Sequence, residues 1–211
     1  MPKYAAARMW RGSSIGALAA VVALVAAGSG GAAGTGDPAG PEGPPVEHGR
    51  ALAPAAAPLP GQTVDGIQCQ SSEQALFHIH ARLTVYVGGR SRSVPYGIGI
   101  GAPQTTPTPA GRFVTAGSCF AWLHTHVADG IIHIESPVRR TYLLGDFFDI
   151  WKQPLSATRA GPARGPVVAF VNGKRWRGNP RNIPLKAHAQ IQLDVGRPLV
   201  APARISSWAG L

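Results

Sequence analysis

The sequence predicts a mainly β domain, a small sandwich or barrel of about seven strands with one short helix. Three observations support this fold class. Apolar and polar residues alternate along residues 75–87, as in a half-buried strand. Turn-forming Asp-Gly and Asn-Gly pairs at 129–130 and 172–173 separate apolar runs. The stretch 143–152 is the one segment where clustered aromatic residues favour a short helix.

The first 27 residues predict export, as a cleaved signal peptide or an N-terminal membrane anchor. Lys3, Arg8 and Arg11 precede an uncharged apolar run over 15–27, which is short for a bilayer span. Both outcomes place the rest of the chain outside the cytoplasm, secreted or anchored to the outer face of the cytoplasmic membrane. The chain then divides into a disordered Pro/Gly/Ala linker (28–62), a β-rich domain (63–204) and a tail (205–211).

The strands of the domain are expected in the following order. The strand over 77–87 places its odd-numbered residues in the core, and Gly88-Gly89 turns the chain. A second strand over 91–100 is interrupted at Pro95, which suits an edge or a bulge. A Pro/Thr loop covers 101–111. The remaining elements are strands at 119–127 and 131–135, the helix at 143–152, a hairpin of 167–171 with 174–177, and a last strand at 189–195.

The chain has two cysteines, Cys69 and Cys119. An even count in an exported protein favours a disulfide. A thiolate ligand or two free thiols are the alternatives.

The formal net charge is +10. Such a field attracts anionic envelope polymers and lipid surfaces, although a solubilising arginine-rich surface is the preferred explanation of the charge. No motif for specific nucleic-acid binding is present. Phosphate-binding glycine loops and serine nucleophile elbows are missing as well.

Five of the seven histidines occur in short clusters: His78 with His80, His124 with His126, and His133. Residues two apart on a strand share a face, so each His-x-His pair directs both imidazoles to the same side.

A two-residue turn at 129–130 would fix the register of the strands on either side. His126 would then lie opposite His133, and His124 opposite Glu135, with opposed Cβ atoms ~5 Å apart. A one-residue slip would bury the wrong face. The turn therefore predicts three imidazoles and one carboxylate on one side of a hairpin.

The histidines at 78 and 80 lie on the non-core face of their own strand and would join this patch if that strand is adjacent. The predicted metal ligands are His78, His80, His124, His126, His133 and Glu135. Imidazole suits copper and zinc. Met1 and Met9 are the only methionines, which excludes a methionine ligand in the domain. A solvated histidine cluster and a pH-sensitive switch are the alternatives.

Two further features accompany the histidines. Phe120 and Trp122 share the predicted histidine face, where they would wall a pocket or form a second small core. Asp146 stands at the start of the predicted helix and suits a capping role better than a catalytic one.

The stretches WLHTHVADGIIHIESP (122–137), LLGDFFDIW (143–151) and FHIHARLTVYVGG (77–89) resemble an uncharacterised family of exported bacterial and archaeal domains. The resemblance covers most of residues 70–195. It implies a domain that recurs as a unit behind signals or anchors, and it implies no activity.

Three functions fit these residues. The first is an extracytoplasmic domain that binds copper or zinc through a multi-histidine site. The second is a metal-dependent enzyme with a three-histidine, one-glutamate site, in which Glu135 is a ligand or general base. The third is a non-catalytic module that binds anionic envelope polymers. The sequence leaves open whether the chain is an enzyme.

Overall fold

The computed structural model describes residues 38–211. The predicted signal peptide or anchor lies outside these residues, as do positions 28–37 of the predicted linker. Within the described part, no helix has the length and apolar character needed to cross a membrane.

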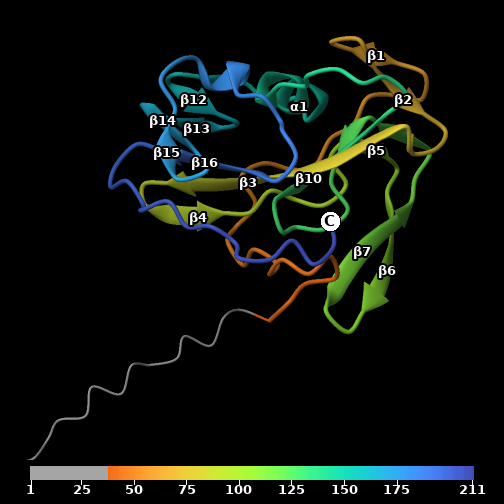
Figure 1. Cartoon of the computed structure of the whole chain (residues 1–211), viewed down its shortest axis with the longest axis horizontal. Helices are drawn as coiled ribbons and strands as arrows, with labels where there is room; N and C mark the ends of the chain where they lie inside the picture. Colours follow the sequence, from red (N-terminus) through yellow and green to blue (C-terminus); the bar gives the residue numbers. More distant parts are fainter. Residues whose placement is uncertain (1–37) are drawn as a thin grey trace, which may run out of the picture. The chain divides into compact units, whose positions relative to one another are not determined.

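A seven-stranded sheet is the centre of the fold, and the predicted mainly β class is confirmed (Figure 1). Strand β3 (Phe77–Val87) is its longest member, and β16 (Ala189–Val195) runs parallel to β3 while β10 (Ile131–Ser136) runs antiparallel to it. The strands in spatial order are β15 (Lys174–Arg175), β14 (Val167–Val171), β16 (Ala189–Val195), β3 (Phe77–Val87), β10 (Ile131–Ser136) and β9 (Leu123–His124), with β4 (Arg90–Arg92) also paired to β3.

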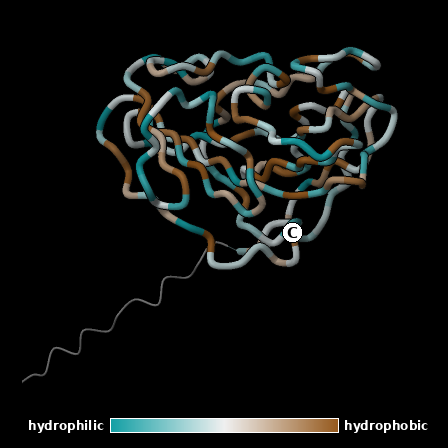
Figure 2. The backbone as a smooth tube through the Cα atoms, turned by 45° about the horizontal axis from the view of Figure 1, so that its top comes forward, coloured by the Kyte–Doolittle hydropathy of each residue, from teal (hydrophilic) through white to brown (hydrophobic). Residues whose placement is uncertain are grey.

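The alternation along β3 places the two faces of the sheet as predicted. Ala81, Leu83 and Val85 are buried on the core face. Figure 2 shows hydrophobic (brown) stretches of the backbone in the middle of the domain. Because side chains alternate along a strand, His78 and His80 project from the opposite face.

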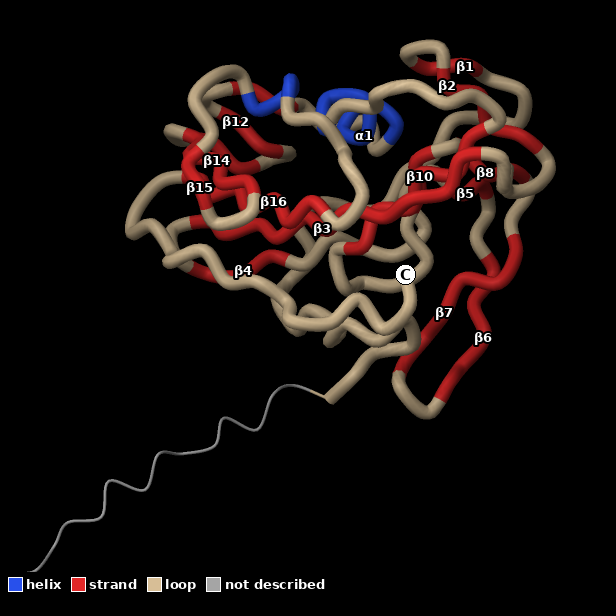
Figure 3. Tube along the Cα trace, viewed as in Figure 1, coloured by secondary structure: helices blue, strands red, loops and turns tan. Residues whose placement is uncertain are grey.

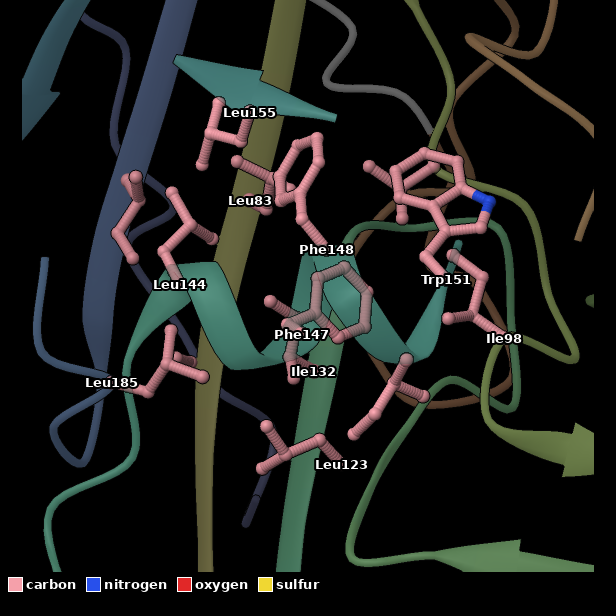
Figure 4. Packing of buried hydrophobic residues seen from close by; sticks show 14 of the residues in the cluster. Leu83, Ile98, Leu123, Ile132, Leu144, Phe147, Phe148, Trp151, Leu155 and Leu185 are labelled. Carbon is pink, nitrogen blue, oxygen red and sulfur yellow. The ribbon is translucent and has the colours of Figure 1, made fainter. Parts of the chain in front are cut away.

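Helix α1 (Leu144–Ile150) covers the core face of the sheet, as the aromatic cluster in its sequence predicted. Phe147 and Phe148 pack with Leu83 and Ile132 in one buried cluster (Figure 4). The Leu143 N–H donates to Asp146 Oδ2 at 3.0 Å, so Asp146 has the predicted role at the helix start.

The other described residues form smaller sheets, a 3-10 helix and loops (Figure 3). None of the sheets closes into a barrel, and the described residues form sixteen strands, most of them short, where about seven were predicted. One sheet has the order β1 (Thr63–Val64), β2 (Ile67–Gln70), β8 (Cys119–Ala121) and β5 (Ile100–Gly101). The others are β11 (Leu155–Ser156), β12 (Arg159–Ala160) and β13 (Ala163–Arg164), and the pair β6 (Gln104–Thr108) and β7 (Gly111–Ala116); the 3-10 helix η1 is Pro180–Asn182.

Two predicted elements are found at the expected positions and two are not. The hairpin of β14 and β15 turns at Asn172-Gly173, where both residues have positive φ, and β16 has the predicted bounds. The predicted strand over 91–100 is mainly loop, because Pro95 lacks the N–H that a ladder needs. The predicted loop over 101–111 contains strand β6.

Residues 38–62 are packed against the domain, which differs from the predicted disordered linker. Leu52 and Ala53 are buried in the main core, and the Trp151 indole donates to the Pro54 carbonyl at 2.8 Å. The Glu47 N–H donates to the Ala128 carbonyl at 2.7 Å. Burying even one leucine contributes roughly 1.5–3 kcal/mol, so a Pro/Gly-rich segment without regular structure can still be held in place. We call residues 38–50 the N-terminal strap.

Candidate metal centre

The pairing of β3 with β10 brings the first histidine pair to the predicted carboxylate. His80 lies opposite His133, and His78 lies opposite Glu135. All four side chains leave the same face of the sheet, because their positions along each strand differ by two. The sequence predicted that His78 and His80 join the patch only if their strand lies beside the hairpin. In the structure, β3 is paired with β10.

The pairing of β9 with β10 differs from the predicted register by two residues. His124, not His126, lies opposite His133. The predicted two-residue turn at 129–130 is wrong because the chain leaves the sheet after His124. The Thr125 N–H instead donates to the Ile98 carbonyl at 3.1 Å, and the His126 carbonyl accepts from the Val114 N–H at 3.1 Å.

The predicted convergence nevertheless occurs, since a shift of two residues preserves the face on which each side chain lies. His126 reaches the cluster from the loop, and its Nε2 atom is 3.0 Å from His124 Nε2. The six predicted ligands therefore lie together. His48 and His188, the two histidines outside the prediction, are exposed.

Two overlapping groups of four residues have ligand atoms within 4.8 Å of one another and could hold a metal ion. We call them the first and second tetrads. The first tetrad consists of His78, His80, His133 and Glu135, and the second of His124, His126, His133 and Glu135.

Distances in the first tetrad are short. His78 Nε2 is 3.0 Å from His80 Nε2, and His80 Nε2 is 3.2 Å from His133 Nδ1. Glu135 Oε1 is 3.0 Å from His78 Nε2 and 3.2 Å from His133 Nδ1. These atoms face a common point at the junction of β3 and β10.

Most of the cluster is buried. His124 is fully buried, and Glu135, His126 and His133 are each exposed by 6% or less. The His78 side chain is 46% exposed and marks the edge that faces solvent. A buried group of this polarity requires partners for its nitrogen and oxygen atoms.

Backbone carbonyls fix the tautomers of the second histidine pair. His124 Nδ1 donates to the Ala121 carbonyl at 2.8 Å, and His126 Nδ1 donates to the Val114 carbonyl at 2.6 Å. A carbonyl oxygen only accepts, so both rings carry their proton on Nδ1 and leave Nε2 as a lone pair. The two Nε2 lone pairs then face each other at 3.0 Å. Only a cation, either a proton or a metal ion, can be shared by such a pair.

Two glutamates that sequence reasoning missed complete the surroundings. Glu42 of the N-terminal strap accepts a hydrogen bond from His133 Nε2 at 2.7 Å, and its side chain is buried. Glu73 Oε1 lies 3.3 Å from His126 Nε2 at a partly exposed position. Neither residue belongs to a periodic segment, so no local pattern marks them.

Electrostatics differ sharply among the rings. Burial and then the neighbouring rings of His133 and His78 lower the pKa of His80 to about 3. Burial and the other imidazoles also lower the pKa of His124 and of His126. These rings are neutral at pH 7 and can act as metal ligands.

His133 behaves in the opposite way. Burial lowers its pKa, but hydrogen bonds to Glu135 and Glu42 outweigh burial and raise the pKa of His133 to about 9. Burial raises the pKa of Glu135, and the hydrogen bond from His133 together with the charges of the imidazoles lowers it to about 2. Without a metal, His133 thus keeps its second ring proton at pH 7 and lies as an imidazolium between the Glu42 and Glu135 carboxylates.

Aromatic residues pack beside the second tetrad. The Phe113 ring stacks on His126 at 4.9 Å, and Phe120 meets His124 edge-on at 5.9 Å. Phe120 belongs to a small second core with Ile100 and Val114, which is one of the two roles that the sequence predicted for it. Trp122 instead packs in the main core, and its indole donates to Gln70.

The predicted disulfide between Cys69 and Cys119 is present and links β2 to β8. Both cysteines are buried, and neither is available as a thiolate ligand. An intramolecular disulfide is typical of an oxidising, extracytoplasmic environment.

No protein family, curated protein or solved structure matches this chain. The fold and the site therefore define a β-rich, disulfide-bonded domain with a buried His/Glu cluster that could hold a metal ion.

Proposed function

We propose that the chain is an extracytoplasmic metal-binding domain that holds copper or zinc in the His/Glu cluster. The observation that carries this proposal is the facing pair of Nε2 lone pairs on His124 and His126. Their Nδ1–H groups are held by carbonyls, which is the arrangement that orients histidine ligands in metal sites.

The spacing of the ligand atoms supports the same function. Two ligands about 2.1 Å from one ion, at tetrahedral or right angles, lie roughly 3.0–3.4 Å apart. The nitrogen–nitrogen distances from His80 to His78 and to His133 are 3.0 and 3.2 Å. Imidazole with carboxylate suits zinc or copper(II), and the described residues contain no methionine that would favour copper(I).

Location outside the cytoplasm belongs to this proposal. The disulfide and the N-terminal sequence support it, as does the resemblance to exported domains. If the N-terminal segment is retained, it attaches the domain to the membrane.

A metal-dependent enzyme is the second candidate function, and the exposed edge at His78 favours it. Substrate or water would reach an ion from this side, with Glu135 as a ligand or base. Turnover of ester or phosphoester substrates by the metal-loaded chain, abolished by chelation, would favour the enzyme over storage or delivery.

The proposal is tested by elemental analysis of the purified chain after exposure to Zn²⁺ or Cu²⁺ and removal of free metal. We expect at least one ion per chain in the wild type and in the control His48→Ala, which removes an exposed histidine outside the cluster. A variant with His124, His126 and His133 all changed to alanine should lose ions. Equal metal in the triple variant and the wild type, or no metal in either, would overturn the proposal.

Metal binding is also expected to release a proton from His133. The pKa of this ring is about 9 without metal, whereas the pKa of His80 is about 3. Between these values the bound proton competes with the metal, so affinity should rise about tenfold for each unit of increasing pH and level off above about 9. Calorimetry in buffers of different ionisation enthalpy measures the proton count. Binding without proton release near neutral pH would contradict the assignment of the proton to His133.

A further inference from the structure

We infer that the cluster is a two-ion centre, in which the Glu135 carboxylate bridges two metal ions held by different histidine pairs. This inference rests on the proposed function and specifies its stoichiometry and ligand sets.

The cluster contains more candidate ligands than one ion can bind. Five imidazoles and Glu135 converge, and a zinc ion in proteins takes about four ligands. The surplus rings are not simple packing residues, because their Nε2 atoms point into the cluster instead of to separate protein partners. His78 Nε2 meets His80 Nε2 at 3.0 Å, and His124 Nε2 meets His126 Nε2 at the same distance.

These rings fall into two pairs that arrive from different parts of the chain. His78 and His80 come from β3, and His124 and His126 come from β9 and the loop after it. Each tetrad contains one complete pair and neither ring of the other. Two foci of ligands therefore lie on either side of Glu135.

The Glu135 carboxylate reaches both foci. Its Oε1 atom is 3.0 Å from His78 Nε2, while its Oε2 atom is 4.0 Å from His124 Nε2. A carboxylate with one oxygen directed to each focus is suited to bridge a metal pair, for which separations of about 3.5–4 Å are usual. Glu135 is buried on β10 between the two histidine pairs, so its position is set by the sheet.

His133 belongs to both tetrads, but its contacts assign it to the first focus, and Glu73 is the further ligand of the second. His133 Nδ1 lies 3.2 Å from both His80 Nε2 and Glu135 Oε1, which places it at the first focus. Glu42 holds the other nitrogen of this ring and so directs Nδ1 inward. Glu73 Oε1 lies 3.3 Å from His126 Nε2 and 4.0 Å from His124 Nε2, at the second focus.

The two ions would consequently have different donor sets. The first ion is bound by three nitrogens and one oxygen, from His78, His80, His133 and Glu135. The second is bound by two nitrogens and two oxygens, from His124, His126, Glu73 and Glu135. Since copper and zinc favour imidazole over carboxylate, the first ion should bind more tightly, and filling should be sequential.

The test is a titration of the chelator-treated, full-length chain with Zn²⁺, read by calorimetry and by elemental analysis. We expect two ions per chain in the wild type and in His48→Ala. The double variant His78→Ala, His80→Ala should keep only the second ion. The double variant His124→Ala, His126→Ala should keep only the first.

Glu73→Gln provides a milder variant, because the Glu73 side chain is 43% exposed and its replacement leaves the core intact. This variant should lower the affinity for the second ion by at least about tenfold and leave the affinity for the first ion unchanged. Cu²⁺ loading gives an independent readout, since two ions this close should show a magnetically coupled electron paramagnetic resonance signal. Circular dichroism and the oxidised disulfide establish that each variant is folded.

The outcomes separate this inference from the proposed function. One ion per wild-type chain, or loss of all binding in both double variants, would overturn the two-ion centre and leave a metal-binding domain. No binding of Zn²⁺ or Cu²⁺ by the wild type would overturn both.

Discussion

Zn²⁺ at about a thousandfold excess over its dissociation constant is expected to raise the free energy of unfolding by about 4 kcal/mol for each ion bound. The reason is that the ligands come from β3, β9 and β10 and converge only in the folded chain. The unfolded chain keeps His-x-His pairs but cannot assemble either tetrad. Urea unfolding with Zn²⁺ and with chelator measures the difference.

His133→Ala should lose the part of this increase that the first ion contributes, because His133 is a ligand of that ion and the second ion keeps its four ligands. The variant also leaves the buried Glu42 carboxylate without its partner, which costs roughly 1–3 kcal/mol without any metal. The comparison is therefore between metal-loaded and metal-free forms of the same variant. The control His48→Ala should keep the full increase. An equal increase in His133→Ala and the wild type would contradict the assigned ligand set.

Replacing both cysteines with alanine is expected to lower the free energy of unfolding by about 4 kcal/mol. The disulfide closes a loop with a sequence separation of 50 residues, and the entropy of the unfolded chain rises when this closure is lost. Cys69 and Cys119 are both buried, so alanine avoids placing a polar group in the core. Chemical unfolding of the variant and the wild type under non-reducing conditions measures the loss.

Reduction separates the loop closure from side-chain packing. The reduced wild type should unfold at nearly the same denaturant concentration as the double-alanine variant, whereas reduction should leave that variant unchanged. The metal content of the folded variant should equal that of the wild type, since neither sulfur is a ligand. A loss below about 1 kcal/mol would show that the unfolded chain is constrained by something other than this bond.

Part of the site could be predicted because strand geometry is local. The two-residue period of a strand fixes that His78 and His80 share a face, whatever the neighbouring strand. The same two-residue period explains why an error in the predicted register of β9 and β10 did not move His124 and His133 to opposite faces. The register of His124 and His133 differs by two residues from the expected one, and a shift of two leaves both side chains on their predicted face, whereas His126 reaches the cluster from the loop.

The described part of the predicted linker, residues 38–62, is packed against the domain for a physical reason that composition does not show. Amino-acid composition indicates whether a segment tends to form helices or strands. The N-terminal strap forms almost no regular structure. The contacts of the strap and of the residues that follow it are irregular: the Glu47 N–H donates to the Ala128 carbonyl, and the Leu52 N–H donates to the Ser93 carbonyl. Such contacts depend on surfaces made by residues far along the chain, which no local window of sequence contains.

The sequence by itself determined the mainly β class and the shared face of each His-x-His pair, and it favoured the pairing of Cys69 with Cys119. These follow from residue types and from periods of two residues, which act over short stretches of chain. Only the tertiary structure decided that β3 lies beside β10, and that Glu42 and Glu73 reach the cluster. Those facts depend on contacts between segments distant in sequence, whose energies arise when the whole sheet and the strap pack together.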